Sequence, residues 1–314
     1  MVDDGASQRE SDEPRPGGFS PEAIFVLSGI SQNIGSILAK SIFGEVEPAT
    51  VAWIRVSFAA IVLLALTWRQ WWPWRARATG TTTTANRRWT RADFAASAVF
   101  GVSIALMNLF FYLAIDRLEL GKSLTIEFIG PIAVAAAMRR TRRNGIAVGL
   151  AVIGVCLLSG VEIGGNGLGV FFILCASTMW AAYIVLGSRV ARQERGLAGL
   201  GVGLVFGAIV LTPFGAPSSG AVFSAPRLLI LCCTVGLLNS VIGYSLDQHV
   251  MRRIATHRFA LLLALLPVSA SFIAFIALDE TPTVLDVIGI AFVLAGVIYQ
   301  QRDSAVMSVE EPVP

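Results

Sequence analysis

The sequence predicts an all-α integral membrane protein in which ten transmembrane helices form two inverted five-helix repeats. The first reason is composition, because 55% of the residues are hydrophobic and 14% are charged, whereas a soluble domain carries about 25% charged residues. The second is that the apolar residues fall into ten segments, each near the ~20 residues that a helix needs to cross a bilayer. The third is that basic residues recur in every second connection between these segments, as in cytoplasmic loops.

The chain begins with a polar and acidic stretch, residues 1–20, which we expect to be a disordered cytoplasmic tail because it cannot bury apolar area. A second cytoplasmic tail is expected at residues 302–314. The ten predicted spans lie between the tails and cover residues 22–43, 48–68, 93–115, 120–138, 144–160, 167–190, 197–216, 228–251, 257–278 and 284–300.

The basic residues predict the orientation of the spans. If the amino terminus is cytoplasmic, 19 of the 24 Lys and Arg residues fall on the cytoplasmic side, as the distribution of charge in membrane proteins requires. The outer connections are acidic instead and include Glu45, Glu47, Asp116 and Glu119. We therefore expect a multi-pass protein of the cytoplasmic (inner) membrane with both termini in the cytoplasm.

One connection is long, and we expect it to form a cytoplasmic loop over residues 69–92. It carries four tryptophans among arginines. Tryptophan at a helix end anchors the helix at the membrane interface, and neighbouring arginines attract anionic lipid headgroups. The loop is therefore predicted to contact the lipid bilayer, and no nucleic-acid partner is expected.

The fourth span contains an acidic residue followed by a helix breaker. Glu127 lies in an otherwise apolar run, where an ionised side chain is costly and is by default a functional hypothesis. Pro131 removes a backbone donor and clashes with the carbonyl of Glu127, while Gly130 allows close approach of a neighbour. The sequence predicts that this broken helix forms one wall of a polar cavity.

A second proline, Pro267, occupies the corresponding place in the ninth span. A basic residue, Lys122 or Arg258, stands nine positions before each proline. We therefore expect residues 21–160 and 161–301 to form two five-helix repeats, the second inverted because five is odd. Inverted repeats around a site near the membrane midplane are typical of secondary transporters. The alternative is a pair of unrelated kinked helices.

Glu127 and Arg55 lie at similar predicted depths in the fourth and second spans, so we expect them to be partners. Either they form a structural ion pair, or Glu127 binds a substrate amine or a coupling proton while Arg55 meets a substrate carboxylate. Asp247 is expected to pair with Arg252 and Arg253 at the inner membrane edge, with a ligand contact as the alternative. The other candidates for the cavity wall, each with helix packing as the alternative, are Gln32, Ser36, Asn108, Tyr112, Trp180, Tyr183 and Tyr244.

Four motifs resemble one family. They are Glu127-Phe-Ile-Gly-Pro-Ile-Ala-Val-Ala, Met179-Trp-Ala-Ala-Tyr-Ile-Val-Leu-Gly-Ser-Arg189, Gly243-Tyr-Ser-Leu-Asp247, and Leu278-Asp-Glu280 followed by Gly289 and Gly296. These are similar to segments of the fourth, sixth, eighth and last helices of the drug/metabolite transporter superfamily (EamA-type), and in particular of its threonine and homoserine exporter branch. The chain departs from that branch at Leu266, where relatives often have an acidic residue, at Asp247, where Glu is usual, and at Gly243, where Pro is common.

Catalytic motifs are missing from the sequence, as are nucleotide-binding and metal-ligand spacings. We therefore expect no enzyme activity, no metal and no cofactor. The resemblance implies a secondary transporter that exports small metabolites, above all amino acids such as threonine and homoserine, by proton-coupled or facilitated alternating access. We expect it to be a monomer or a homodimer. The alternatives are an exporter of drugs or other metabolites, and a membrane-embedded lipid-modifying enzyme or sensor scaffold.

Overall fold

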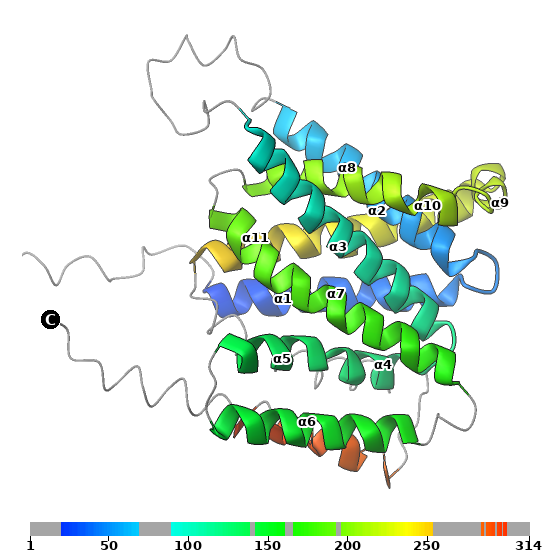
Figure 1. Ribbon diagram of the computed structural model, residues 1–314. Coiled ribbons are helices and arrows are strands. Elements are labelled where there is room, and N and C mark those ends of the chain that lie inside the picture. The colour runs from blue at the N-terminus through cyan, green and yellow to red at the C-terminus, as the bar shows by residue number, and fades with distance from the viewer. Residues whose placement is uncertain are drawn as a thin grey trace, which may run out of the picture.

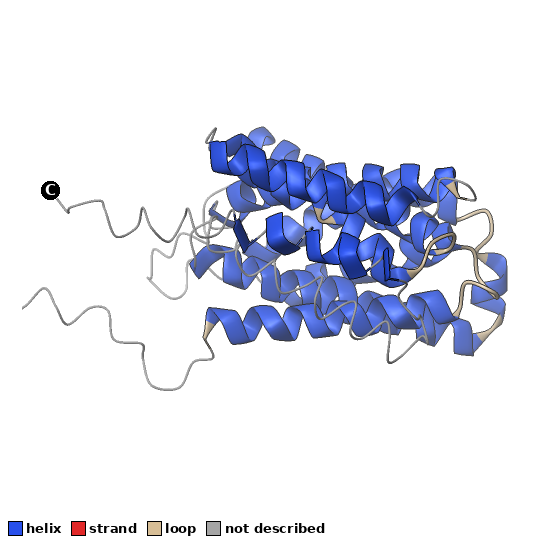
Figure 2. Cartoon of the chain, turned by 90° about the horizontal axis from the view of Figure 1, so that it is seen from below, coloured by secondary structure: helices blue, strands red, loops and turns tan. Residues whose placement is uncertain are grey.

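The computed structural model describes residues 20–68, 89–138, 142–160, 166–192 and 196–253, together with short helical pieces between 284 and 299. All regular structure in these parts is helical (Figure 2), which confirms the predicted all-α membrane class. Within the described residues, six helices are long and apolar enough to cross a membrane: Ala23–Ser41, Pro48–Thr67, Arg91–Ile115, Gly167–Val190, Gly196–Gly215 and Pro226–Arg253.

Several predictions concern residues outside the described parts. They are the two tails, most of the predicted loop at 69–92, and the predicted ninth span with Arg258, Leu266 and Pro267.

The first three helices begin where local signals place them. They are α1 (Pro21–Ser41), α2 (Pro48–Thr67) and α3 (Arg91–Ile115). Proline is the first residue of α1 and of α2. It is favourable there because an N–H at the first helical position has no partner within the helix, so its absence costs nothing. A capping box opens α3, in which Thr90 and Asp93 each bond the backbone N–H of the other.

The predicted fourth span is broken into α4 (Leu120–Glu127) and α5 (Ile129–Met138). Pro131 has no N–H, so it cannot bond the carbonyl of Glu127 one turn earlier, and α4 ends at that residue. Gly130 faces α7 (Gly167–Arg192), and a side chain at this position would collide with the carbonyl group of Ser177. The glycine therefore lets the broken helix lie directly against α7.

The predicted eighth span is continuous, but it is not a regular α-helix. It consists of α10 (Pro226–Val235), a π-helical segment η4 (Gly236–Gly243) and α11 (Tyr244–Arg253). A π-helix bonds residue i to i+5 and is frequent at functional sites. The remaining described helices are α6 (Arg142–Gly160), α8 (Gly196–Gly215) and the short α9 (Gly220–Ser224).

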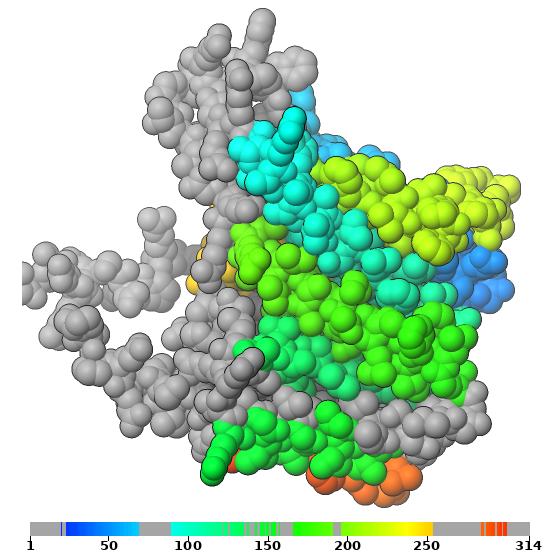
Figure 3. Space-filling model, viewed as in Figure 1, coloured from blue at the N-terminus to red at the C-terminus, as the bar shows by residue number. Residues whose placement is uncertain are grey.

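The helices lie side by side in one bundle (Figure 1). α2 packs mainly against α8, and α3 packs against both α7 and α8, while α1 packs against the run from α10 to α11. Gly101 of α3 and Gly203 of α8 meet so closely that a side chain on Gly101 would collide with the other backbone. Beyond α5, α6 forms an edge of the bundle next to the helical pieces at 284–299 (Figure 3).

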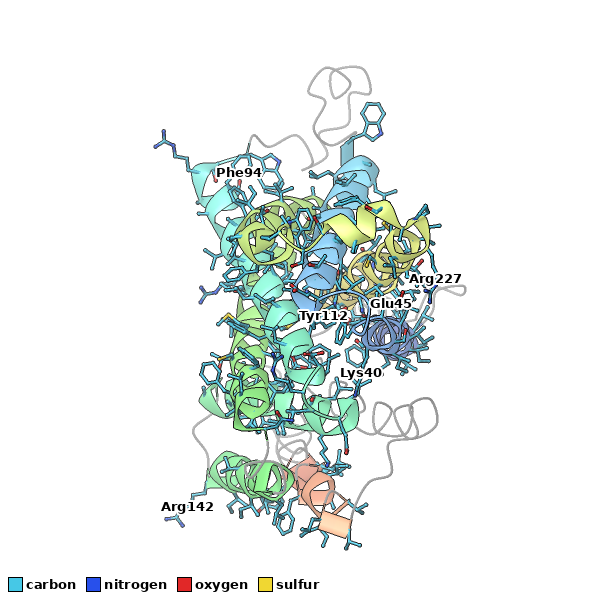
Figure 4. The ribbon with its side chains drawn as sticks, turned by 90° about the vertical axis from the view of Figure 1, so that its right-hand side faces the viewer. Lys40, Glu45, Phe94, Tyr112, Arg142 and Arg227 are labelled. Atoms are coloured by element: carbon cyan, nitrogen blue, oxygen red, sulfur yellow. The ribbon has the colours of Figure 1, made fainter. Side chains whose placement is uncertain are left out.

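Contacts between connections show which of them share one end of the bundle. Arg227 pairs with Glu45 at 3.2 Å, and both lie on one side of the end-on view (Figure 4). The side-chain amide of Asn166 donates to the carbonyl of Arg117 at 2.6 Å, and Thr50 donates to the carbonyl of Gly215 at 2.9 Å. Lys40 Nζ also donates to the carbonyl of Leu118 at 3.4 Å, which links these contacts to one another. The described connections that hold these residues therefore lie at the same end of the bundle.

Candidate functional site

A cavity of about 100 Å³ lies inside the bundle, bounded by α1, α2, α3, α4, α7, η4 and α11. A water molecule needs about 10–15 Å³ of such space, so the cavity has room for several waters or one small metabolite. Among the candidates from the sequence, the residues that line it are Gln32, Ser36, Arg55, Asn108, Glu127, Trp180, Tyr183 and Tyr244.

Three other candidates take different positions. Tyr112 lies behind the cavity wall, where it is fully buried and bonds Arg55. Gly130 and Pro131 shape the break between α4 and α5 without lining the cavity, whereas Phe128, the residue at the break, does line it.

Arg55 is buried, and its hydrogen-bond partners among the described residues are neutral. Its Nε donates to Ser240 Oγ at 2.9 Å, its Nη1 to the Tyr112 hydroxyl at 2.8 Å and its Nη2 to the Tyr244 hydroxyl at 3.2 Å. The guanidinium carbon also lies over both rings, 5.3 Å from the centroid of Tyr112 and 5.8 Å from that of Tyr244. Hydroxyls and aromatic faces therefore hold this cation in place.

Of the two alternatives for Arg55 and Glu127, the structural ion pair is not formed in the described structure. Both residues line the cavity, but Arg55 donates its hydrogen bonds to the hydroxyl groups of Ser240 and Tyr112 instead. Glu127 is 6% exposed, and in the described part of the chain no donor bonds its carboxylate. The cavity thus contains the Arg55 cation and the Glu127 carboxyl group, which do not contact each other directly.

The two tyrosines at Arg55 belong to two similar arrangements. The Tyr244 hydroxyl donates to Asn108 Oδ1 at 3.0 Å, and Asn239 Nδ2 donates to the Tyr112 hydroxyl at 3.4 Å. Asn108 and Tyr112 are four residues apart in the α-helix α3, whereas Asn239 and Tyr244 are five apart across η4. Each spacing equals one hydrogen-bonded turn of its helix type, so the two helices present the same Asn and Tyr pair to the cation.

Asn239 and Ser240 are site residues that were not predicted from the sequence. Both are buried polar residues in the apolar run of the eighth span. The available signal was this adjacent polar pair, with a tyrosine four or five positions later. The spacing of a regular α-helix does not reveal the π-helical turn that brings Asn239 and Tyr244 together.

The predicted pairing of Asp247 with Arg252 and Arg253 is wrong. Asp247 lines the cavity, and its carboxylate contacts Ser28 Oγ at 2.6 Å, Gln32 Nε2 at 3.2 Å and the Tyr183 hydroxyl at 3.3 Å. Residues five and six apart on an α-helix point in different directions, so the exposed arginines do not share its face. Asp247 instead joins α11 to α1 and α7.

Aromatic rings also line the cavity. Phe128, the residue after Glu127, meets Trp180 edge to face with ring centroids 5.2 Å apart, and Tyr183 stacks on Phe100, which lies behind the wall, at 5.5 Å. The faces of such rings attract cations. In the described residues, no group of three His, Cys, Asp or Glu side chains is placed to hold a metal ion.

Comparisons with known proteins agree with this architecture. Residues 167–299 match the EamA-like transporter family. The threonine/homoserine exporter RhtA of Salmonella typhimurium (strain LT2) is 30% identical over 282 residues, which cover 88% of this chain and 89% of that protein. The protein of the same name from Escherichia coli (strain K12) is 29% identical over 282 residues, with the same coverage.

A protein of known crystal structure has the same fold. It superposes with a TM-score of 0.58 over 93% of this chain and 99% of the other, at 16% sequence identity. With the similarity to the two exporters, the resemblance predicted from the motifs is confirmed. The chain belongs to the EamA-like transporter family of the drug/metabolite transporter superfamily.

Proposed function

We propose that this protein is a secondary transporter of the cytoplasmic membrane that exports small amino acids by alternating access, with threonine and homoserine as the first candidates. The observation that carries the proposal is that Arg55 and Glu127 line the same cavity and do not form an ion pair with each other. A free amino acid carries one negative and one positive group at neutral pH. A site with a cation and a separate carboxylate matches this pattern of charge.

The substrate carboxylate binds at Arg55 in this proposal. A guanidinium group has five N–H donors, and three of those on Arg55 are used by Ser240, Tyr112 and Tyr244. One donor remains on each terminal nitrogen, which is the geometry that binds a carboxylate through two parallel hydrogen bonds. The tyrosines hold the group in position before the substrate arrives, which lowers the entropic cost of binding.

The substrate amine binds at Glu127. Its carboxylate has no protein donor in the described part of the chain, so it is available to an ammonium group. Trp180 and Phe128 line the cavity with it and supply aromatic faces that favour a cation. The two ends of the substrate would therefore contact different helices.

Neutral polar groups account for a hydroxylated side chain on the substrate. Asn108 lines the cavity and is 3% exposed, and its Nδ2 has no partner in the described structure. A buried donor without a partner is costly, so a substrate hydroxyl that accepts this hydrogen bond would stabilise the complex. Gln32 and Ser36 line the same cavity and extend the set of neutral polar groups.

The architecture we propose is the ten-helix inverted repeat, with residues 21–160 and 161–301 as its halves and both termini in the cytoplasm. If each span is equivalent to the span five places later, α3 corresponds to the run α10–α11, and α1 corresponds to α7. The packing of α3 on α7 then has its counterpart in the packing of α10–α11 on α1, and that of α3 on α8 in that of η4 on α2. The matching Asn and Tyr pairs on α3 and η4–α11 also support this symmetry.

Counterflow in proteoliposomes tests the function. Vesicles loaded with a high concentration of one unlabelled compound should accumulate the labelled compound when the transporter exchanges it. We expect threonine, homoserine and similar zwitterions to exchange, and we expect a methyl ester or an N-acetyl derivative of the same amino acid to fail, since each lacks one charge. Exchange of cationic drugs or sugars, with none for amino acids, would overturn the proposal.

A further inference from the structure

The Ser28 hydroxyl contacts three polar groups at once. Its Oγ lies 2.6 Å from Asp247 Oδ1, 2.9 Å from the carbonyl oxygen of Gly243 and 3.0 Å from Gln32 Nε2. A serine hydroxyl carries one hydrogen, and a backbone carbonyl is only an acceptor. If the single Ser28 hydrogen bonds the carbonyl of Gly243, the contact with Asp247 needs a second hydrogen. Asp247 supplies it only when its carboxyl group is protonated and donates to Ser28 Oγ.

The other contacts of Asp247 are neutral. Its second carboxyl oxygen accepts hydrogen bonds from Gln32 Nε2 at 3.2 Å and from the Tyr183 hydroxyl at 3.3 Å. In the described part of the chain, no Lys or Arg forms an ion pair with this carboxyl group. The surroundings of Asp247 thus supply hydrogen bonds and no opposite charge, unlike those of a structural salt bridge.

Ser28 also forms a hydrogen bond between α1 and the π-helical turn. Ser28 reaches the carbonyl of Gly243, and Ser31 donates to the carbonyl of Leu238 at 2.7 Å. Leu238 and Gly243 are five residues apart, which is one turn of a π-helix. A side chain on Gly243 would lie 2.5 Å from Gln32 Cγ, so α1 and η4 are in close contact here. The bond between Ser28 and Gly243 is therefore one of two that hold α1 on this turn.

We propose that Asp247 is a proton-binding site that couples transport to a proton gradient through Ser28. When the Asp247 carboxylate takes up a proton from cavity water, the acid donates to Ser28, Ser28 donates to Gly243, and α1 is held on η4. When the proton returns to water, the Ser28 hydroxyl turns to the carboxylate, and the bond to Gly243 is lost. The coupling rests on the proposed transport function, whereas proton binding by Asp247 does not.

The groups packed around Asp247 include no second carboxyl group in contact with α1. The residues of α1 that bond Asp247 are the neutral Ser28 and Gln32, and α8, which packs on α11, has no titratable residue. From α7 the phenol of Tyr183 bonds Asp247, and Tyr244 lies beside that ring. The charged groups further away are Arg55 and Glu127 across the same cavity, and the exposed His249, Arg252 and Arg253 on α11.

Infrared difference spectroscopy on the full-length protein in liposomes tests the proton site, by comparing alkaline buffer with a mildly acidic buffer in which exposed carboxylates stay ionised. A protonated carboxyl group has a C=O stretching band that a carboxylate lacks. We expect such a band in the wild type, its loss in Asp247→Asn, and its retention in Glu127→Gln, which removes the other cavity carboxyl group. A wild-type spectrum without the band, or an unchanged band in Asp247→Asn, would overturn the proposal.

A second variant covers failure of Asp247→Asn to fold. Ser28→Ala keeps the acid but removes the oxygen that accepts its hydrogen bond, so the band should remain and shift in frequency. An unshifted band would show that the titrating acid does not contact Ser28, and would also overturn the proposal.

The coupling is measured separately with a pH-sensitive dye trapped in proteoliposomes. We expect the number of protons moved per substrate molecule to fall at least tenfold in Asp247→Asn and also to fall in Ser28→Ala. An unchanged ratio in both variants would overturn the coupling. If the wild type exchanges no amino acid in counterflow, the proposed function fails, and the infrared band still decides the proton site.

Discussion

Tyr112 of α3 and Tyr244 of α11 bond the same guanidinium group, that of Arg55, through their hydroxyls at 2.8 and 3.2 Å. The two residues are far apart in the chain and are brought together by the packing of the bundle around α2 (Figure 4 labels Tyr112). Because each tyrosine is in turn bonded to an asparagine, the position of the cation depends on α3 and on η4 together. A rearrangement of either helix would therefore move the Arg55 guanidinium group, which we assign to substrate binding.

Replacing Arg55 tests the role of its fork geometry. Lysine keeps the charge but has one nitrogen, so it cannot contact Ser240, Tyr112 and Tyr244 in the same way and bind a carboxylate through two parallel bonds. We expect Arg55→Lys to raise the KM for amino acid exchange at least tenfold, which corresponds to about 1.4 kcal/mol. Arg227→Lys is the control, because Arg227 pairs with Glu45 at an exposed position. This variant should exchange substrate as the wild type does.

Glu127 should be dispensable for folding and required for transport. No protein donor in the described structure depends on its carboxylate, so Glu127→Gln leaves no partner unbonded. We expect a melting temperature near that of the wild type, with loss of zwitterion exchange. Since Arg55 and Glu127 are not a direct pair, adding Arg55→Gln should not restore transport. A large drop in melting temperature that the double change corrects would contradict this prediction.

The glycine at the helix break should not tolerate a methyl group. In Gly130→Ala the new Cβ would collide with the carbonyl of Ser177, and such overpacking costs about 1–3 kcal/mol. Gly145→Ala is a matched control in another helix, because a Cβ there meets nothing within 4 Å. Thermal unfolding of the two purified variants should show a clear loss for the first and little change for the second. Equal stability would show that α5 and α7 are not in close contact.

The π-helical turn predicts an unusual tolerance to deletion. Asn239 and Tyr244 are five residues apart in η4, so removing Ile242 leaves them four apart, as Asn108 and Tyr112 are in α3. A regular α-helix would then present both residues to Arg55. Deletion of Phe110 is the control, because it leaves the pair in α3 three apart and turns its halves by about 100° relative to each other. We expect fluorescence-detected size-exclusion chromatography to show a folded peak for the first deletion and a loss of it for the second.

Cysteine labelling tests the orientation. In a cysteine-free background, new thiols at Thr82 and Arg142 should react only from the cytoplasm, and those at Glu45 and Ala221 only from outside. Ala221 is chosen because it lies exposed in α9, next to the start of α10. Since Glu45 and Arg227 are in contact, the two outer positions should give the same result. Labelling of either from the cytoplasm would contradict the predicted orientation.

Several features followed from the sequence alone, because their causes are local. Apolar runs of the length of a bilayer determine which segments are buried in lipid, and they predicted the long helices that the structure describes. The break after Glu127 was also predictable, since Pro131 lacks an N–H wherever the chain places it. A polar residue in an apolar run is costly in lipid, and this reasoning identified most of the described polar residues that line the cavity.

The partners of these residues were decided by the tertiary structure. Arg55 and Glu127 have matching depth and opposite charge, but depth along a helix does not state which side of the helix a residue faces, and Arg55 bonds hydroxyls from α3 and α11 instead. Asp247 appeared to belong to the membrane edge until the packing of α11 on α1 and α7 placed it in the cavity. The π-helical turn depends on bonds from Ser28 and Ser31, more than 200 residues away. Such contacts depend on how whole helices pack, which the spacing of residues within one helix does not contain.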